Sequence, residues 1–146
     1  MLQINTGTHT GPPGTTAIPE MHRDVVRRAI RIITNDIVPR HTCSNFARLP
    51  GGRTLAQMIA LPIWLNYDPT ATGNLYGWVV PDTHPHDVAL GRFALRLGVW
   101  SVAGTIVHEL AHLNGAPGGN SHDAERALRD CGLRSPNGPY DPSIRG

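Results

Sequence analysis

The chain has 146 residues, of which 40% are hydrophobic and 16% charged, and its formal net charge is +2 with the histidines neutral. This length and apolar content are typical of one globular domain that buries its own core. No stretch approaches the roughly 18 consecutive apolar residues that span a membrane, and the small net charge does not favour a nucleic-acid partner. We therefore expect neither membrane nor nucleic acid as a partner, while the oligomeric state stays unknown.

The predicted elements begin after a segment rich in Thr, Gly and Pro. Residues 1–17 lack a periodic apolar pattern, so we expect a flexible N-terminal tail or a peripheral extended segment, followed by a single domain over residues 18–146. Pro19 and Glu20 make a suitable first turn of a helix that Pro39 closes. Four branched residues within it recur at helical spacing: Val26, Ile30, Ile33 and Ile37.

Three short strands are predicted in the middle of the chain. The candidate segments are residues 63–65, 75–80 and 88–97, and Gly91 interrupts the third. A few strands followed by helices indicate an α+β fold, in which a short mixed sheet packs on helices.

A second helix is predicted over residues 99–114, with Gly115 as the stop signal just after it. Its apolar residues recur at helical spacing: Val99, Val102, Ile106, Leu110 and Leu113. The opposite stripe carries Ser101, Thr105, His108 and His112. Small polar residues on this stripe leave room for a cleft, so we expect the two histidines to face that cleft rather than the core.

The sequence His108-Glu109-Leu110-Ala111-His112 carries the chemistry of this helix. Residues four apart lie on one helical face, so both imidazoles can reach a single zinc ion. Zinc with three protein ligands keeps a position for water and lowers the pKa of that water towards neutrality. Glu109 lies at the flank of the same cleft, where its carboxylate can act as the general base.

The third zinc ligand is expected on the next helix. A turn rich in Gly and Pro follows Gly115, Asn120 or Ser121 offers an N-cap, and the apolar face then contains Ala124, Ala127, Leu128 and Cys131. His122 is favoured, because imidazole is a common zinc ligand and this residue lies at the start of the helix. Glu125 is the alternative, and Asp123 or a distant residue stays open. If His122 binds, Glu125 or Asp123 can accept its second ring N–H.

This motif, with the small-residue turn before it, resembles the active-site helix of zincin metallopeptidases over residues 99–131. The resemblance implies a small zincin-like α+β domain with zinc as cofactor. Metzincins are excluded, because Gly118 stands where they place a third histidine and no methionine follows Met58. A histidine at the start of the next helix is similar to SprT-type zincins, whereas a glutamate ligand there resembles a compact gluzincin.

The sequence thus predicts a zinc-dependent metallopeptidase that hydrolyses a peptide or protein substrate by metal-activated water. The alternatives are a non-catalytic module, with structural zinc or with a peptide-binding role, and a metallohydrolase that acts on substrates other than peptides. A strand within residues 88–97 would pair with extended substrate. Tyr76 and Tyr140 are weaker candidates for stabilising the oxyanion, and each is more simply a packing or surface residue.

Two further expectations concern the cysteines and the compartment. Cys43 and Cys131 form either one disulfide or two reduced thiols, and neither belongs to a C-x-x-C zinc pair. The N-terminus lacks the charged start and apolar core of a signal peptide, so we expect a cytoplasmic protein, with export by a leaderless route as the alternative. His84 and His86 are interpreted as an exposed polar turn.

Overall fold

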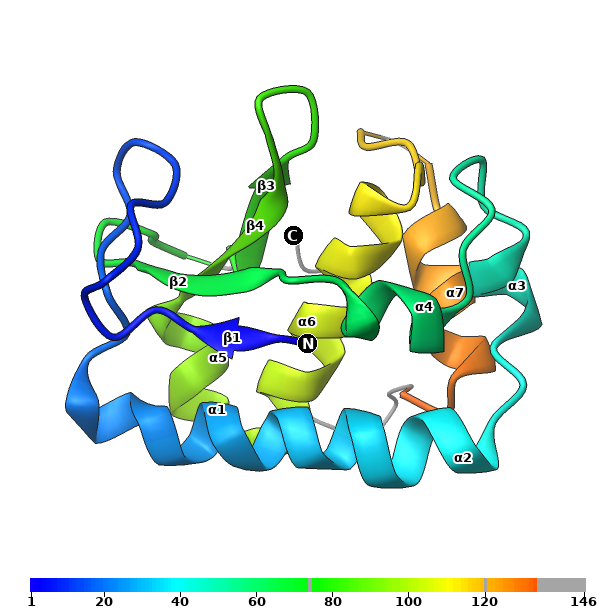
Figure 1. The fold of residues 1–146 in the computed structure, drawn as a ribbon, viewed down its shortest axis with the longest axis horizontal. Helices are drawn as coiled ribbons and strands as arrows, with labels where there is room; N and C mark the ends of the chain where they lie inside the picture. The colour runs from blue at the N-terminus through cyan, green and yellow to red at the C-terminus, as the bar shows by residue number, and fades with distance from the viewer. Residues whose placement is uncertain (74, 120, 134–146) are drawn as a thin grey trace.

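The computed structural model describes residues 1–73, 75–119 and 121–133. It confirms the α+β fold, with a small mixed sheet packed against helices (Figure 1). In chain order the elements are β1 (Gln3–Ile4), α1 (Glu20–Ile32), the π-helical turn η1 (Ile33–Ile37), α2 (Val38–Arg40), α3 (Ser44–Ala47), α4 (Leu55–Ala60), β2 (Trp64–Asp68), β3 (Gly77–Val80), β4 (His84–Gly91), α5 (Arg92–Leu97), α6 (Val99–Leu113) and α7 (Asp123–Asp130).

The sheet has the strand order β1-β2-β4-β3. Strands β1, β2 and β4 run parallel, and β3 is antiparallel to β4. The predicted third strand over 88–97 is wrong beyond Gly91, because α5 begins at Arg92. Ala94 and Leu95 are both buried, and two adjacent inward residues fit one helical face but not the alternating faces of a strand.

The N-terminal residues pack against the sheet. We expected residues 1–17 to form either a flexible tail or a peripheral extended segment. The structure agrees with the extended segment, because β1 pairs with β2 and Thr16 bridges to Tyr67. The His9 ring stacks on Trp64 with centroids 4.4 Å apart, and its Nε2 lies 2.7 Å from Asp87 Oδ1. This segment therefore covers part of the sheet rather than extending as a tail.

The first predicted helix is present and ends one residue later than expected. α1 continues through η1 into α2, so the helical path passes Pro39 and ends at Arg40. Pro39 has no N–H and so removes one main-chain hydrogen bond from the helix. The π-helical turn η1 ends two residues before Pro39, and its wider turn changes the pattern of main-chain hydrogen bonds there.

Helix α6 forms the centre of the molecule, and its predicted range is confirmed within one residue. Every residue from Ser101 to Ala111 is buried, because α1, α5, α7, β3 and β4 all pack around it (Figure 1). The prediction that the polar stripe of α6 faces an open cleft is therefore wrong for most of the helix. At Gly77 a Cβ atom would lie 2.8 Å from Thr105 Cγ2, so the small residues of the stripe allow β3 to approach α6 closely.

Cys43 and Cys131 form a disulfide with Cα atoms 4.7 Å apart. This bond joins the residue before α3 to the residue after α7, and both cysteines are buried. Across the described part of the chain, no helix combines the length and apolar character needed to cross a membrane.

Candidate metal centre

The two histidines of α6 point their ring nitrogens at one another. His108 Nε2 and His112 Nε2 lie 3.1 Å apart, with the rings inclined at 69°. Two imidazole nitrogens bound tetrahedrally to zinc, each about 2.0–2.1 Å from the metal, lie about 3.3 Å apart. The pair therefore fits two corners of a zinc site with little rearrangement.

The His112 ring is held by the turn that follows α6. His112 Nδ1 lies 2.9 Å from the carbonyl oxygen of Ala116, so Nδ1–H donates and Nε2 is left with its lone pair. Gly115 makes the turn possible with φ of 98°, and the Ala116 N–H bonds back to Ala111 O at 2.9 Å. The sequence identified Gly115 as a helix stop, but nothing in it pointed to the Ala116 carbonyl as a positioning group.

Glu109 is a buried acid whose carboxylate oxygens have no hydrogen-bond partner within the described residues. Burial, together with the nearby negative charge of Glu125, raises the pKa of Glu109 from 4.5 to about 8. Unsatisfied buried carboxylates are costly, and they gather where a cation or a reacting proton is bound. A cation bound beside Glu109 would satisfy these carboxylate oxygens.

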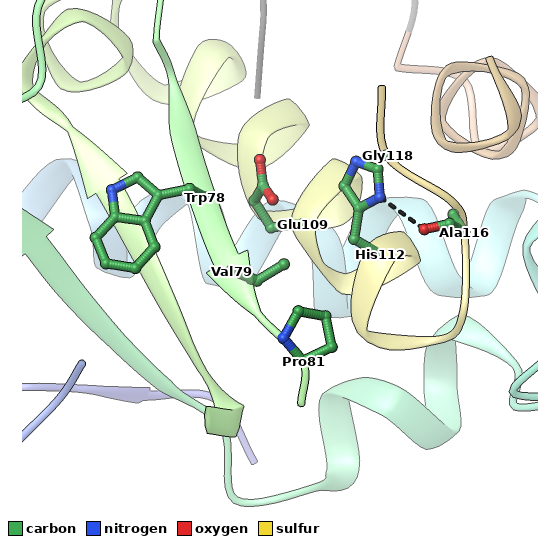
Figure 2. A pocket seen from close by; sticks show the side chains of 7 residues that line it. All are labelled: Trp78, Val79, Pro81, Glu109, His112, Ala116 and Gly118. Carbon is green, nitrogen blue, oxygen red and sulfur yellow. Dashed lines mark hydrogen bonds between the residues drawn. The ribbon is translucent and has the colours of Figure 1, made fainter. Parts of the chain in front are cut away.

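A pocket of about 210 Å³ opens over the C-terminal half of α6. Its lining residues are Trp78, Val79, Pro81, Glu109, His112, Ala116 and Gly118. Figure 2 shows Glu109 between α6 and β3, His112 towards the turn with Ala116 and Gly118, and the Trp78 ring on the other side of the strand. The candidate base and one candidate ligand thus share a pocket whose other wall is β3.

Strand β3 is anchored through Trp78. The indole Nε1 donates to Asp68 Oδ2 at 2.8 Å, and Thr70 donates to Asp68 Oδ1 from its main-chain nitrogen and its hydroxyl. Partial burial acts to raise the pKa of Asp68, but these hydrogen bonds outweigh it and hold the pKa below its ordinary value. The bond between Trp78 and Asp68 therefore holds β3, which forms one wall of the pocket.

The two candidates for the third ligand lie in different surroundings. Glu125 Oε1 is 3.9 Å from His108 Nδ1, the side chain is 12% exposed, and its Oε2 is buried without a hydrogen-bond partner in the described residues. His122 is exposed, and together with Glu125 it lines a hollow of about 260 Å³ on α7. Asp123 pairs with Arg126 at 3.1 Å. Glu125 is therefore the candidate that lies beside the histidine pair.

The three ligands are not gathered around one point. Over residues 1–73, 75–119 and 121–133, no set of three His, Cys, Asp or Glu side chains is close enough to hold a metal ion. His108 and His112 fit the requirement for two ligands, and Glu125 would have to turn from the Nδ1 side of His108 towards its Nε2 side. Of the two weaker candidates for stabilising the oxyanion, Tyr76 is buried against Phe93 and Tyr140 is outside the described residues. Asn120, one of the two expected N-caps, is also outside them.

Comparison of the chain with family models, with curated proteins and with solved structures gave no match. The case for a metal centre therefore rests on three features of α6: the facing histidines, the hydrogen bond that orients His112, and the buried Glu109.

Proposed function

We propose that the protein is a zinc-dependent metallopeptidase in which His108 and His112 bind the metal and Glu109 is the general base. One observation carries the proposal. Two imidazole nitrogens face each other at 3.1 Å on the helix that also presents a buried carboxylate without a hydrogen-bond partner among the described residues. A purely structural zinc site does not need that carboxylate, whereas hydrolysis does.

The chain's own residues have distinct roles in the proposed reaction. When bound, zinc lowers the pKa of a coordinated water towards neutrality. Glu109 accepts the proton of the attacking water at a carboxylate oxygen and delivers it to the nitrogen of the departing amine. A cation bound beside Glu109 would lower the pKa of its carboxyl, which burial and the charge of Glu125 raise to about 8. The Ala116 carbonyl keeps the His112 ring in the tautomer that can bind.

Glu125 is the third ligand in this proposal, in place of His122. Support comes from the 3.9 Å separation between Glu125 Oε1 and His108 Nδ1, together with the exposed position of His122. Both residues line the hollow on α7, but of the two only Glu125 has a side chain recorded against a histidine of α6. The zinc affinities of two single variants, Glu125→Ala and His122→Ala, test this choice.

The expected substrate-pairing strand must be reassigned. β4 lies between β2 and β3, so both of its edges are already paired. β3 is at the end of the sheet in the described part of the chain, and it lines the pocket with Glu109 and His112. An extended peptide added to the free edge of β3 would bring its main chain past the pocket that contains Glu109 and His112.

The disulfide supports a proposal about the compartment. Cytosolic thiols are kept reduced, so the Cys43–Cys131 bond favours export over the cytoplasmic alternative. We propose that the protein acts in an oxidising environment.

The test compares Glu109→Gln with the wild type for zinc content and for cleavage of a mixed peptide library followed by mass spectrometry. The variant should retain zinc and lose about 10²–10⁴-fold in hydrolysis, because it lacks the proton acceptor. Glu20→Gln, the same change at an exposed position of α1, is the control. Unchanged hydrolysis in Glu109→Gln would refute the mechanism. Zinc binding without any cleavage by the wild type would favour a non-catalytic module, and cleavage of small esters or amides alone would favour a non-peptide metallohydrolase.

A further inference from the structure

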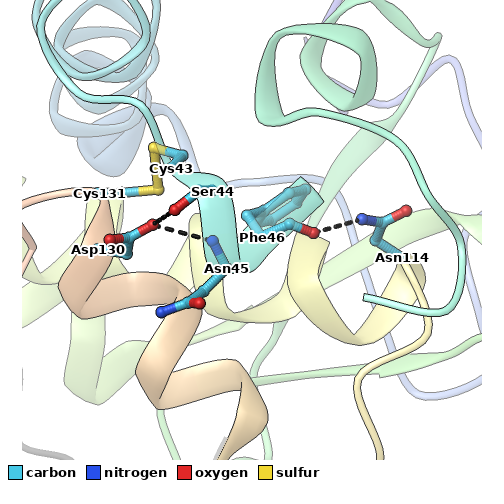
Figure 3. Close-up of a disulfide and its surroundings, with 7 residues drawn as sticks. All are labelled: Cys43, Ser44, Asn45, Phe46, Asn114, Asp130 and Cys131. Carbon is cyan, nitrogen blue, oxygen red and sulfur yellow. Dashed lines mark hydrogen bonds between the residues drawn. A yellow bond between two sulfur atoms is a disulfide. The ribbon is translucent and has the colours of Figure 1, made fainter. Parts of the chain in front are cut away.

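A short segment links the ends of the two helices that carry the candidate site. We call residues 43–47 the bracket, because they contact the C-terminal ends of α6 and α7 (Figure 3). On the α7 side, Cys43 is bonded to Cys131, and Asp130 Oδ2 accepts hydrogen bonds from Ser44 Oγ at 3.0 Å and from Asn45 N at 2.9 Å.

On the α6 side, the bracket is held by Asn114, the residue directly after the helix. Its Nδ2 donates to the Phe46 carbonyl at 3.0 Å and to the Arg53 carbonyl at 2.9 Å, and the residue is fully buried. Asn114 lies two residues from His112, and Cys131 lies six residues from Glu125. The bracket therefore connects the end of the helix that carries His112 to the end of the helix that carries Glu125.

Helix α7 is held by packing against α6 and α3 and by this attachment. It has eight residues, fewer than the roughly 12–15 that a helix needs to be even marginally stable alone. Its buried residues are Ala124, Ala127 and Leu128, two of which bury little apolar area. Before it, the chain passes through Gly118 and Gly119, which offer little restraint. The bonds of Asp130 and Cys131 at the other end therefore add to the packing on α6 that keeps Glu125 near His108.

We propose that the Cys43–Cys131 disulfide controls zinc affinity, so that the site binds the metal tightly only in the oxidised chain. The proposal rests on the zinc site proposed above. In the oxidation step the two cysteine thiols lose two protons and two electrons to glutathione disulfide, which becomes two glutathione thiols. The chain then holds zinc weakly where thiols are kept reduced and tightly after it enters an oxidising compartment. A peptidase of this kind stays inactive in the cell that makes it.

The test measures zinc affinity by competition with a chromophoric chelator, with zinc alone as the probe. Wild-type oxidised chain is compared with the double variant Cys43→Ala and Cys131→Ala, which removes the bond without leaving thiols that could themselves bind zinc. The double variant should bind zinc at least tenfold more weakly. His9→Ala is the control, because it removes a stacked and hydrogen-bonded side chain far from the bracket and should leave the affinity unchanged.

A second variant keeps the proposal testable if the double variant does not fold. Asp130→Ala in the oxidised chain removes the two hydrogen bonds to the bracket while the disulfide stays, and it should weaken zinc binding two- to fivefold. Equal affinity in a folded double variant would overturn the redox control, as would an unchanged affinity in Asp130→Ala where the double variant is unfolded. If the oxidised wild type itself binds no zinc, the proposed function fails before the disulfide is in question.

Discussion

Replacing Glu109 by Gln should make the stability of the metal-free protein much less dependent on pH. Burial of Glu109, with the charge of Glu125 as the second cause, raises its pKa to about 8 in the folded chain, against 4.5 for an ordinary glutamate. Below pH 4.5 this carboxyl is protonated in both states and costs no stability. As the pH rises from 4.5 to 8, only the unfolded chain ionises freely, so the free energy of unfolding falls.

The size of the effect follows from the same two values. One pKa unit corresponds to about 1.4 kcal/mol, so the full penalty above pH 8 is at most about 5 kcal/mol, and water entering the pocket reduces it. Urea unfolding of both proteins with EDTA at pH 4.5, 6 and 8 measures it. Glu109→Gln should gain on the wild type as the pH rises, while Glu20→Gln should track the wild type. A difference between Glu109→Gln and the wild type that is the same at all three pH values would refute the reasoning.

Three other perturbations separate parts of the site. Glu125→Ala should weaken zinc binding more than tenfold and His122→Ala much less; chelator competition would show the reverse order if His122 is the ligand. Gly77→Ala places a Cβ 2.8 Å from Thr105 and should cost about 1–3 kcal/mol in urea unfolding, and a neutral result would mean that β3 can shift away from α6. Hydrogen bonds from α3 lower the pKa of Asp130, so Asp130→Asn should cost less than about 1 kcal/mol at pH 7, and this cost should shrink as acid protonates the carboxyl; a cost that does not change with pH would contradict this role.

The sequence predicted the elements whose signals are local. The helix over 99–114 is marked by apolar spacing and a following glycine, and it was found within one residue of α6. The strand candidates at 63–65 and 75–80 overlap β2 and β3. The segment 88–97 was misread after Gly91, because a short apolar run fits a helix and a strand equally well when its neighbours in space are unknown.

Features made by distant segments could not be predicted from the sequence. The order that puts β4 inside the sheet and β3 at its end depends on pairings between strands far apart in the chain. The polar stripe of α6 suggested an open face, but Gly77 lets β3 cover much of it. The relative positions of His122 and Glu125 depend on how α7 docks, and that docking involves the bond between Cys43 and Cys131, which spacing alone left open.

The central claim is that α6 carries a zinc site, and anomalous X-ray diffraction at the zinc edge from crystals grown with zinc tests it most directly. The account predicts one strong peak about 2.0–2.1 Å from both His108 Nε2 and His112 Nε2, with a Glu125 oxygen as the third protein ligand. A peak at other residues, or none with zinc in excess, would contradict it.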